Sequence, residues 1–248
     1  MVIAELEARK LRHDPTELIT RAVQPALWLL VFGQVAGRVK AFSSGDMRYQ
    51  DFMTPGILAQ SVLFISIFYG ISVLWERDLG ILHKFLVTPT PRTALVLGKA
   101  LSAGVRGLSQ SVVIYALALL IHVKLNWNPL ALLGVLVIVL LGASIFSTFS
   151  LVIAVLVKTR ERFMGIGQVM TMPLFFASNA IYPIDIMPPW LQVVSKGNPL
   201  SYEVDALRTL MLHGGPSVFG LWVDFAVLLA WAIGLILLGG KLYGNVVK

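Results

Sequence analysis

The sequence contains no cysteine and very little charge. Among its 248 residues, only 13% are Asp, Glu, Lys or Arg. The missing thiols exclude disulfides and zinc–thiolate sites. A soluble domain carries about 25% charged residues, whereas this chain is 57% hydrophobic with a mean hydropathy of +0.80. Composition alone therefore indicates an integral membrane protein.

The phosphate-binding loop of ATP-hydrolysing proteins is also missing. Gly98-Lys99 and Gly240-Lys241 lack both the upstream glycine and the following hydroxyl that this loop requires. The four histidines are scattered without metal-ligand spacing, and no nucleophile–base arrangement lies within an apolar segment. The sequence thus predicts neither enzymatic activity nor a cofactor or metal site in this chain.

Ionisable residues within the apolar segments are scarce. Asp224 is the one acid inside such a segment, while Lys99 and Arg106 lie near a segment end, where long side chains reach the membrane surface. Proton- and sodium-coupled carriers usually bury ionisable groups in the membrane. A secondary transporter is therefore poorly supported, although it stays as an alternative.

Apolar stretches of about 20 residues, the length that crosses a bilayer, predict six membrane spans. They run over Ala22–Val39, Pro55–Leu74, Ala100–Val123, Leu130–Val157, Phe163–Tyr182 and Val218–Leu242. With both termini in the cytoplasm, fourteen Lys and Arg residues lie inside and six outside, as the positive-inside rule requires. The net charge of +7 is therefore assigned to membrane topology, and no nucleic-acid partner is expected.

The chain reads as a single all-α membrane domain over residues 1–248. Its first residues, 1–14, are charged, which argues against a cleavable signal peptide and favours a short basic helix lying along the cytoplasmic membrane surface. Asp14, Pro15 and Glu17 form a helix-start signature, and Pro25 is expected to kink the first span.

A cytoplasmic loop over residues 75–93 mixes charged and apolar residues at helical spacing until Thr88-Pro89-Thr90-Pro91 ends the pattern. We expect a short surface helix with Glu76, Arg77, Asp78, His83 and Lys84 facing water. Such a helix could insert into a cytosolic partner or simply shield the bundle, and its residues do not decide between these roles.

The region Pro173–Arg208 contains too many prolines for a simple span, because unpaired backbone groups are costly in lipid. Its 183–214 portion resolves into two short helices. The first begins near Pro188-Pro189 and ends at Gly197, and the second has Asn198 as its N-cap and Pro199 at its first position. Asp205 and Arg208 lie three apart on the second helix and can pair. The charge distribution places this helical pair outside the cell.

Semi-polar side chains recur along two spans. Intervals of three or four residues align Gln168, Thr171, Phe175, Asn179 and Tyr182 on the fifth span, and Gln60, Phe64 and Phe68 on the second. Polar groups in lipid need partners, so these faces should meet either a water-filled path or a neighbouring helix. Hydrogen bonding between helices is the commoner use of such residues.

Taken together, several motifs resemble the hallmark region of type-2 ABC exporter permeases, a family of bacterial drug, lipo-oligosaccharide and polysaccharide exporters. They are the aromatic–Ser run before Asn179, the Tyr182-Pro183 corner, the Trp190 helix, and Asn198-Pro199-Leu200-Ser201-Tyr202 followed by Asp205, Leu207 and Arg208. In the cytoplasmic loop, Glu76-Arg77, Gly80 and Phe85–Pro89 resemble the coupling helix of that family.

The resemblance implies a bacterial inner-membrane permease subunit that pairs with a second permease copy and with a separate ATPase carrying ATP and Mg²⁺. It implies that Glu76, Arg77, Asp78, Gly80, Lys84, Phe85 and Thr88 contact the ATPase. It also implies that the semi-polar faces line the path of an amphiphilic, lipid-like, drug or glycan cargo, and that the outer helical pair, with Pro183, Trp190, Asn198, Pro199, Tyr202, Asp205 and Arg208, caps this path as a re-entrant hairpin. The alternative is a non-transporting membrane scaffold or sensor that recruits a cytosolic partner.

Overall fold

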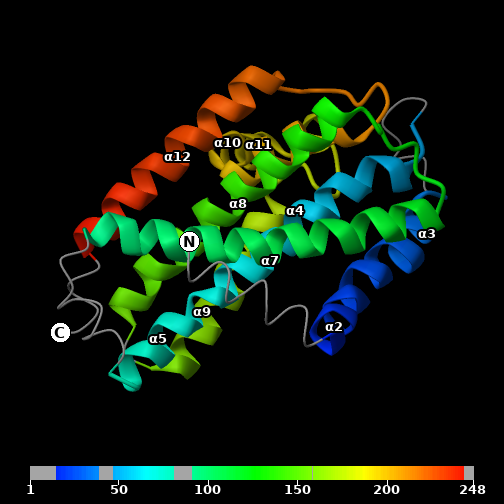
Figure 1. Ribbon diagram of the computed structural model, residues 1–248. Helices are drawn as coiled ribbons and strands as arrows, with labels where there is room; N and C mark the ends of the chain where they lie inside the picture. Colours follow the sequence, from blue (N-terminus) through cyan, green and yellow to red (C-terminus); the bar gives the residue numbers. More distant parts are fainter. Residues whose placement is uncertain (1–14, 39–46, 81–90, 158, 243–248) are drawn as a thin grey trace.

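The chain folds into a helical bundle, and the computed structural model describes residues 15–38, 47–80, 91–157 and 159–242 (Figure 1). Within these residues, four helices are long and apolar enough to cross a bilayer: Tyr49–Asp78, Arg92–Leu120, Pro129–Leu156 and Leu221–Leu242. They correspond to the second, third, fourth and sixth expected spans. The sequence therefore identified the four longest helices and their order.

The second of the expected spans is longer than its hydrophobic pattern suggested. Helix α4 (Tyr49–Tyr69) continues through Gly70 into α5 (Ile71–Asp78), so the charged residues after Leu74 extend this helix. A separate surface helix was expected to begin with Glu76. This expectation is wrong for Glu76, Arg77 and Asp78, which belong to the long helix. The remainder of that expected helix, including His83, Lys84, Phe85 and Thr88, lies in 81–90, outside the described residues.

Helix α8 (Pro129–Leu156) lies at the centre of the bundle. It packs against α7 (Arg92–Leu120), α12 (Leu221–Leu242), α4 and the shorter α11 (Pro199–Met211). The main core is formed by apolar residues of these helices, including Ile57, Val139, Phe146 and Leu207, all almost completely buried. In a bilayer, close van der Waals packing of this kind, together with hydrogen bonds between helices, holds a bundle together.

The first expected span is built from three consecutive pieces: α2 (Pro15–Ala26), the π-helix η1 (Leu27–Phe32) and α3 (Gly33–Ala36). Pro15 is already helical, but the expected N-cap Asp14 lies outside the described residues; Pro25 lies inside α2 just before the π-helix. A proline removes one helical hydrogen bond, and a π-helix is a common way to absorb such a defect. Residues 1–14, expected to form a surface helix, lie outside the described residues.

The fifth expected span is the 17-residue α9 (Arg160–Phe176), which ends six residues before Tyr182. After a turn and the short η3 (Ile184–Ile186), the chain forms α10 (Pro189–Gly197) and α11. The expected limits of α10 and the Asn198 N-cap of α11 are confirmed: the Asn198 side chain accepts a hydrogen bond from the Leu200 N–H. Figure 1 shows α10 and α11 at the opposite end of the bundle from α5.

Candidate functional site

The end of α5 is joined to two neighbouring helices by ion pairs. The ammonium of Lys99, on α7, lies 2.7 Å from both carboxylate oxygens of Glu76. The guanidinium of Arg160, on α9, lies 2.6 Å from the Asp78 carboxylate and 3.6 Å from the centre of the Trp75 ring. We call these five residues the α5 cluster.

The two ion pairs of the α5 cluster differ in their exposure to water. The side chains of Lys99 and Glu76 are 7% and 24% exposed, whereas those of Arg160 and Asp78 are 32% and 38% exposed. The expectation that Glu76 faces water is therefore not met, because its carboxylate contacts a buried lysine. Screening by solvent weakens the second pair more than the first, so Glu76–Lys99 is the stronger link.

Two further predicted coupling residues complete this end of α5. Arg77 donates to the backbone oxygen of Val157, at the end of α8, over 3.4 Å. Gly80 has φ +69° and its N–H bonds to the Arg77 oxygen. A left-handed residue at this position is the usual way to end a helix, and glycine adopts it without strain.

On the opposite side of the molecule, α11 is held by the side chains of two buried charged residues. Its Asp205 carboxylate accepts hydrogen bonds from the Ser217 hydroxyl and from the backbone N–H groups of Val218 and Phe219, at 2.9–3.0 Å. These contacts fix the loop that precedes α12. Asp205 is 0% exposed. Buried polar groups need hydrogen-bond partners inside the protein, and these three donors supply them.

The guanidinium of Arg208 fixes α11 to two other segments. It donates to the Asn179 backbone oxygen at 2.7 Å and to the Phe52 oxygen at 3.4 Å, and it stacks over the Phe52 ring at 3.9 Å. The expected pairing of Asp205 with Arg208 is therefore wrong: within the part of the chain that the structure describes, each side chain bonds to a different segment. Helical spacing permitted the pair, but tertiary partners compete successfully for both groups.

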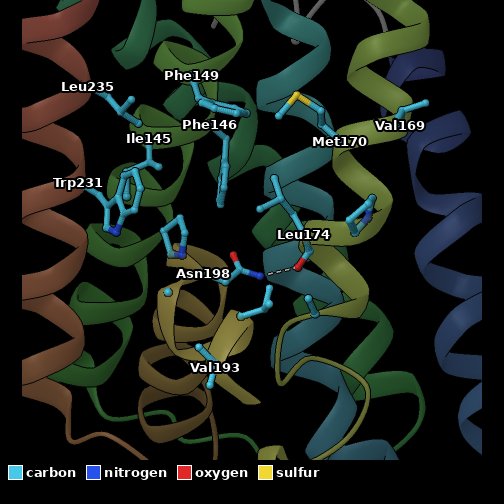
Figure 2. A pocket seen from close by; sticks show the side chains of 15 residues that line it. Ile145, Phe146, Phe149, Val169, Met170, Leu174, Val193, Asn198, Trp231 and Leu235 are labelled. Atoms are coloured by element: carbon cyan, nitrogen blue, oxygen red, sulfur yellow. Dashed lines mark hydrogen bonds between the residues drawn. The ribbon is translucent and has the colours of Figure 1, made fainter. Parts of the chain in front are cut away.

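The remaining predicted residues of the outer helical pair have mixed surroundings. Asn198 donates from its amide nitrogen to the Leu174 oxygen at 2.7 Å, which joins α11 to α9 (Figure 2). Pro199 is buried, and the Tyr202 hydroxyl donates to the Lys196 oxygen at 2.7 Å. Trp190 is 68% exposed, and Pro183 immediately precedes η3.

The semi-polar stripe expected on the fifth span does not form one continuous face. Thr171, Phe175 and Asn179 are buried within the bundle, whereas Gln168 is exposed and Tyr182 is half-buried. Because α9 ends at Phe176, the last two predicted residues lie in the turn that follows. The Thr171 hydroxyl donates to the Gly167 oxygen of its own helix. Its polar group is therefore satisfied within α9, and packing inside the bundle accounts for much of the semi-polar stripe.

On the second span, Gln60 is buried, while Phe64 and Phe68 are half-buried with their ring centres 6.2 Å apart. The exposed face of α9 carries different residues from those predicted. It is formed by Met164, Val169, Met172 and Phe176, which are 38–71% exposed. In the sequence these residues form an apolar repeat. Choosing path residues by their polarity does not select such a repeat.

An apolar groove of about 560 Å³ lies beside α9 (Figure 2). Its walls come from α8, α9 and α12, represented by Phe146, Val169 and Trp231, and its end is formed by Val193 and Asn198 of the outer helical pair. Asn198 already uses both polar atoms of its amide within the protein. The groove therefore offers van der Waals contacts to an apolar chain and no free polar group at Asn198.

Sequence reasoning missed Glu203, a second fully buried acid of α11. It is 0% exposed, and among the described residues neither carboxylate oxygen has a hydrogen-bond partner. A Cβ at Gly142, near the middle of α8, would lie within 2.5 Å of this carboxylate. The lack of a side chain at Gly142 thus makes room for Glu203. In the sequence, Glu203 was visible as an acidic residue within the segment predicted to form the second short helix.

Comparison with known proteins gives a consistent result. Residues 1–212 match the family model for ABC-2 type transporters. The chain is 28% identical over 226 residues to the daunorubicin resistance ABC transporter permease protein DrrB1 of Streptomyces coeruleorubidus, covering 91% of this chain and 77% of that protein. It is 27% identical over 237 residues to the inner membrane transport permease YadH of Escherichia coli K12, covering 87% and 86% respectively.

Proposed function

The chain belongs to the ABC-2 type transporter family and is a membrane transport permease. We propose that it forms the membrane-spanning half of an ATP-driven exporter. A separate ATPase, carrying ATP and Mg²⁺, powers it from the cytoplasm. The cargo is an amphiphilic compound, a lipid-like molecule, a drug or a glycan. It leaves the cytoplasm or the inner leaflet of a bacterial inner membrane.

The α5 cluster is the observation that carries this proposal. A partner that pushes on the residues after Gly80 meets a helix end tied to α7 through Lys99 and to α9 through Arg160. Displacement of α5 therefore moves three helices at once. Because α4 and α5 form one continuous helix, the same displacement reaches the outer end of the second span.

In this proposal the chain crosses the membrane six times, so both termini lie in the cytoplasm. The four longest helices form four of these spans, and α9 and the α2–η1–α3 helix form the other two. The outer helical pair is a re-entrant hairpin. Contacts of α11 with α8 support this, since Leu210 lies against Gly134 and Glu203 against Gly142. At ~1.5 Å per residue, Gly142 lies roughly 20 Å along α8 from its first residue, a large fraction of the bilayer core of about 30 Å.

A second copy of the chain completes the transport path. The exposed apolar face of α9, with Met164, Val169, Met172 and Phe176, has no covering helix among the described residues along these side chains. A contiguous apolar face can pack against lipid or against another helix. We assign it to the partner permease, so that the path runs along the dimer interface, with Gln168 beside it.

Co-expression with the ABC ATPase encoded nearest to this gene tests the proposal. We expect the two proteins to purify together from detergent and to hydrolyse ATP in proteoliposomes. Gly80→Val should reduce the co-purified ATPase or its activity several-fold, because a β-branched residue at positive φ is strained by about 1–3 kcal/mol. Gly214→Val is the matched control, since Gly214 also has a positive φ (+67°) and open space around it but lies after α11, away from α5.

Two results would contradict the proposal. If no ATPase accompanies the wild-type chain, the scaffold or carrier alternatives gain support. If the complex forms but Gly80→Val behaves like Gly214→Val, the end of α5 does not couple the two proteins.

A further inference from the structure

Pro25 leaves one backbone oxygen of α2 without its helical donor. In an α-helix, the N–H of residue 25 would bond to the oxygen of Arg21, and proline has no N–H. The side chain of Gln110, on α7, takes this place: its amide nitrogen donates to the Arg21 oxygen over 3.5 Å. The Gln110 amide is thereby oriented by a defect in a neighbouring helix.

The oxygen of the same amide is unsatisfied. Gln110 is 1% exposed, and among the described residues its Oε1 has no hydrogen-bond partner. Gln110 lines a cavity of about 250 Å³ between α2, α4 and α7. A buried acceptor without a donor costs about 1–3 kcal/mol. The Gln110 oxygen therefore lacks a hydrogen-bond donor until a group carrying an O–H or N–H occupies the cavity.

The other walls of the cavity are polar on one side and apolar on the other. Arg21 and Gln24, whose side chains carry N–H groups, line it from α2, and Ser61 contributes an oxygen from α4 whose proton is already given to the Ile57 oxygen. Phe64 covers the apolar side. This combination suits a small group with an anionic centre and hydroxyls: the anion meets the guanidinium, and the hydroxyls donate to the two free acceptors.

An apolar groove of about 610 Å³ continues from this cavity along the same helix. The two spaces share Thr20 and Gln24 as lining residues. Beyond them, the groove is lined by Leu27, Trp28 and Val31 and reaches Val35. A polar cavity for a head and an adjoining apolar groove for a chain together fit an amphiphile better than a fully soluble compound.

We propose that the Gln110 cavity binds the headgroup of an anionic, hydroxyl-bearing membrane lipid of the phosphoglycerol type. The phosphate contacts Arg21, and glycerol hydroxyls donate to the Gln110 and Ser61 oxygens. One acyl chain lies along Leu27 and Val31. This site goes beyond the proposed function, because it requires neither a transport direction nor a particular cargo.

Native mass spectrometry of the purified permease–ATPase complex in detergent tests the proposal with three lipids of identical acyl chains. Phosphatidylglycerol carries both charge and hydroxyls, phosphatidic acid carries charge without glycerol hydroxyls, and phosphatidylcholine has no net charge and no hydroxyl. We expect phosphatidylglycerol to bind at least five-fold more tightly than either of the others. Equal binding of phosphatidylglycerol and phosphatidic acid would overturn the proposal.

Two variants connect the preference to this cavity. Gln110→Met should abolish the preference for phosphatidylglycerol over phosphatidic acid. Ser61→Ala should reduce it about two-fold to three-fold with the fold intact, since this hydroxyl bonds only within its own helix turn. Gln34→Met, an exposed glutamine on α3 outside the cavity, is the matched control and should keep the full preference.

If Gln110→Met does not fold, the Ser61→Ala result decides alone, and an unchanged preference in that variant refutes the site. Glycerol 1-phosphate distinguishes the lipid from its soluble headgroup. We expect no displacement of phosphatidylglycerol at millimolar concentration. Displacement at concentrations similar to those of the lipid would show that the cavity binds soluble phosphoglycerol and would overturn the assignment to a lipid.

Discussion

The two ends of the bundle are held together by different kinds of contact. At the outer helical pair, Asp205 and Arg208 are almost completely buried and bond to fixed backbone groups. At the α5 cluster, the Glu76–Lys99 pair is partly buried, whereas Asp78 and Arg160 are about one-third exposed and bond to each other. Buried groups lose heavily when a partner is removed, whereas water replaces a lost exposed partner at small cost.

The two ends therefore differ in which contacts break at small cost. The Asp78–Arg160 pair, which water can replace, is able to break and re-form during a transport cycle, and it lies where the ATPase is proposed to act. The buried charges of Asp205 and Arg208 fix α11 to α4, to the turn after α9 and to the loop before α12. We therefore expect substitutions at the outer helical pair to reduce stability, and those at the α5 cluster to reduce coupling.

Arg208→Met should have the largest effect. It leaves the Asn179 and Phe52 oxygens without their donor and removes the stacking on Phe52. A buried hydrogen bond from a charged group contributes about 1.5–3 kcal/mol, so we expect the largest drop in melting temperature in a thermal unfolding assay in detergent. Arg208→Lys, which keeps the charge, should lie between this variant and wild type. A wild-type melting temperature for Arg208→Met would refute the anchoring role.

Asp205→Ala should follow in size. Three donors before α12 lose their acceptor, which we expect to cost about 2–3 kcal/mol. Asp205→Asn keeps one acceptor oxygen and serves as the matched comparison, with a smaller loss. Urea-dependent unfolding followed by tryptophan fluorescence measures both. Equal stability of the Ala and Asn variants would show that the bonds to residues 217–219 contribute little.

The Glu76–Lys99 pair should affect activity more than stability. Glu76→Lys and Lys99→Glu each place like charges together, and we expect cargo-dependent ATP hydrolysis to fall about five-fold or more, the lower range of typical coupling energies. The double exchange, Glu76→Lys with Lys99→Glu, restores opposite charges and should recover most of the activity. A double variant no better than either single one would rule out a direct pair.

Asp78→Asn should have the smallest effect. Its partner Arg160 is exposed and keeps the Trp75 ring as a second contact, so the expected loss is about 0–1 kcal/mol. High salt should weaken the wild-type contact and leave the variant unchanged. Comparing melting temperatures in low and high salt measures this. A loss as large as that of Asp205→Ala would remove the distinction between the two ends.

Local signals in the sequence were sufficient for much of this fold. Apolar length identified four spans, and Asn198-Pro199 and Pro188-Pro189 identified the starts of two short helices, because caps and prolines act within a few residues. The end of α9 was misplaced: its pattern ran to Tyr182, although the helix stops at Phe176. Apolar turn residues buried by tertiary packing look like a continuing span.

The candidate site was less accessible to sequence reasoning. The pairing of Asp205 with Arg208 followed from helical spacing, yet segments far away in the sequence supply the actual partners at Phe52 and Asn179. The contact between Glu76 and Lys99 joins residues 23 positions apart across the loop. Such choices depend on how helices pack, and neither residue type nor spacing contains that information.

Cysteine labelling of intact cells tests most directly whether the two ends lie on opposite sides of the membrane. Because the chain has no cysteine, Lys196→Cys on α10 and Leu79→Cys at the exposed end of α5 each introduce a unique thiol. We predict that a membrane-impermeant maleimide labels the Lys196→Cys variant from outside. The Leu79→Cys variant should react only after permeabilisation, and less when the ATPase is bound. Outside labelling of Leu79→Cys, or protection of Lys196→Cys, would contradict this arrangement.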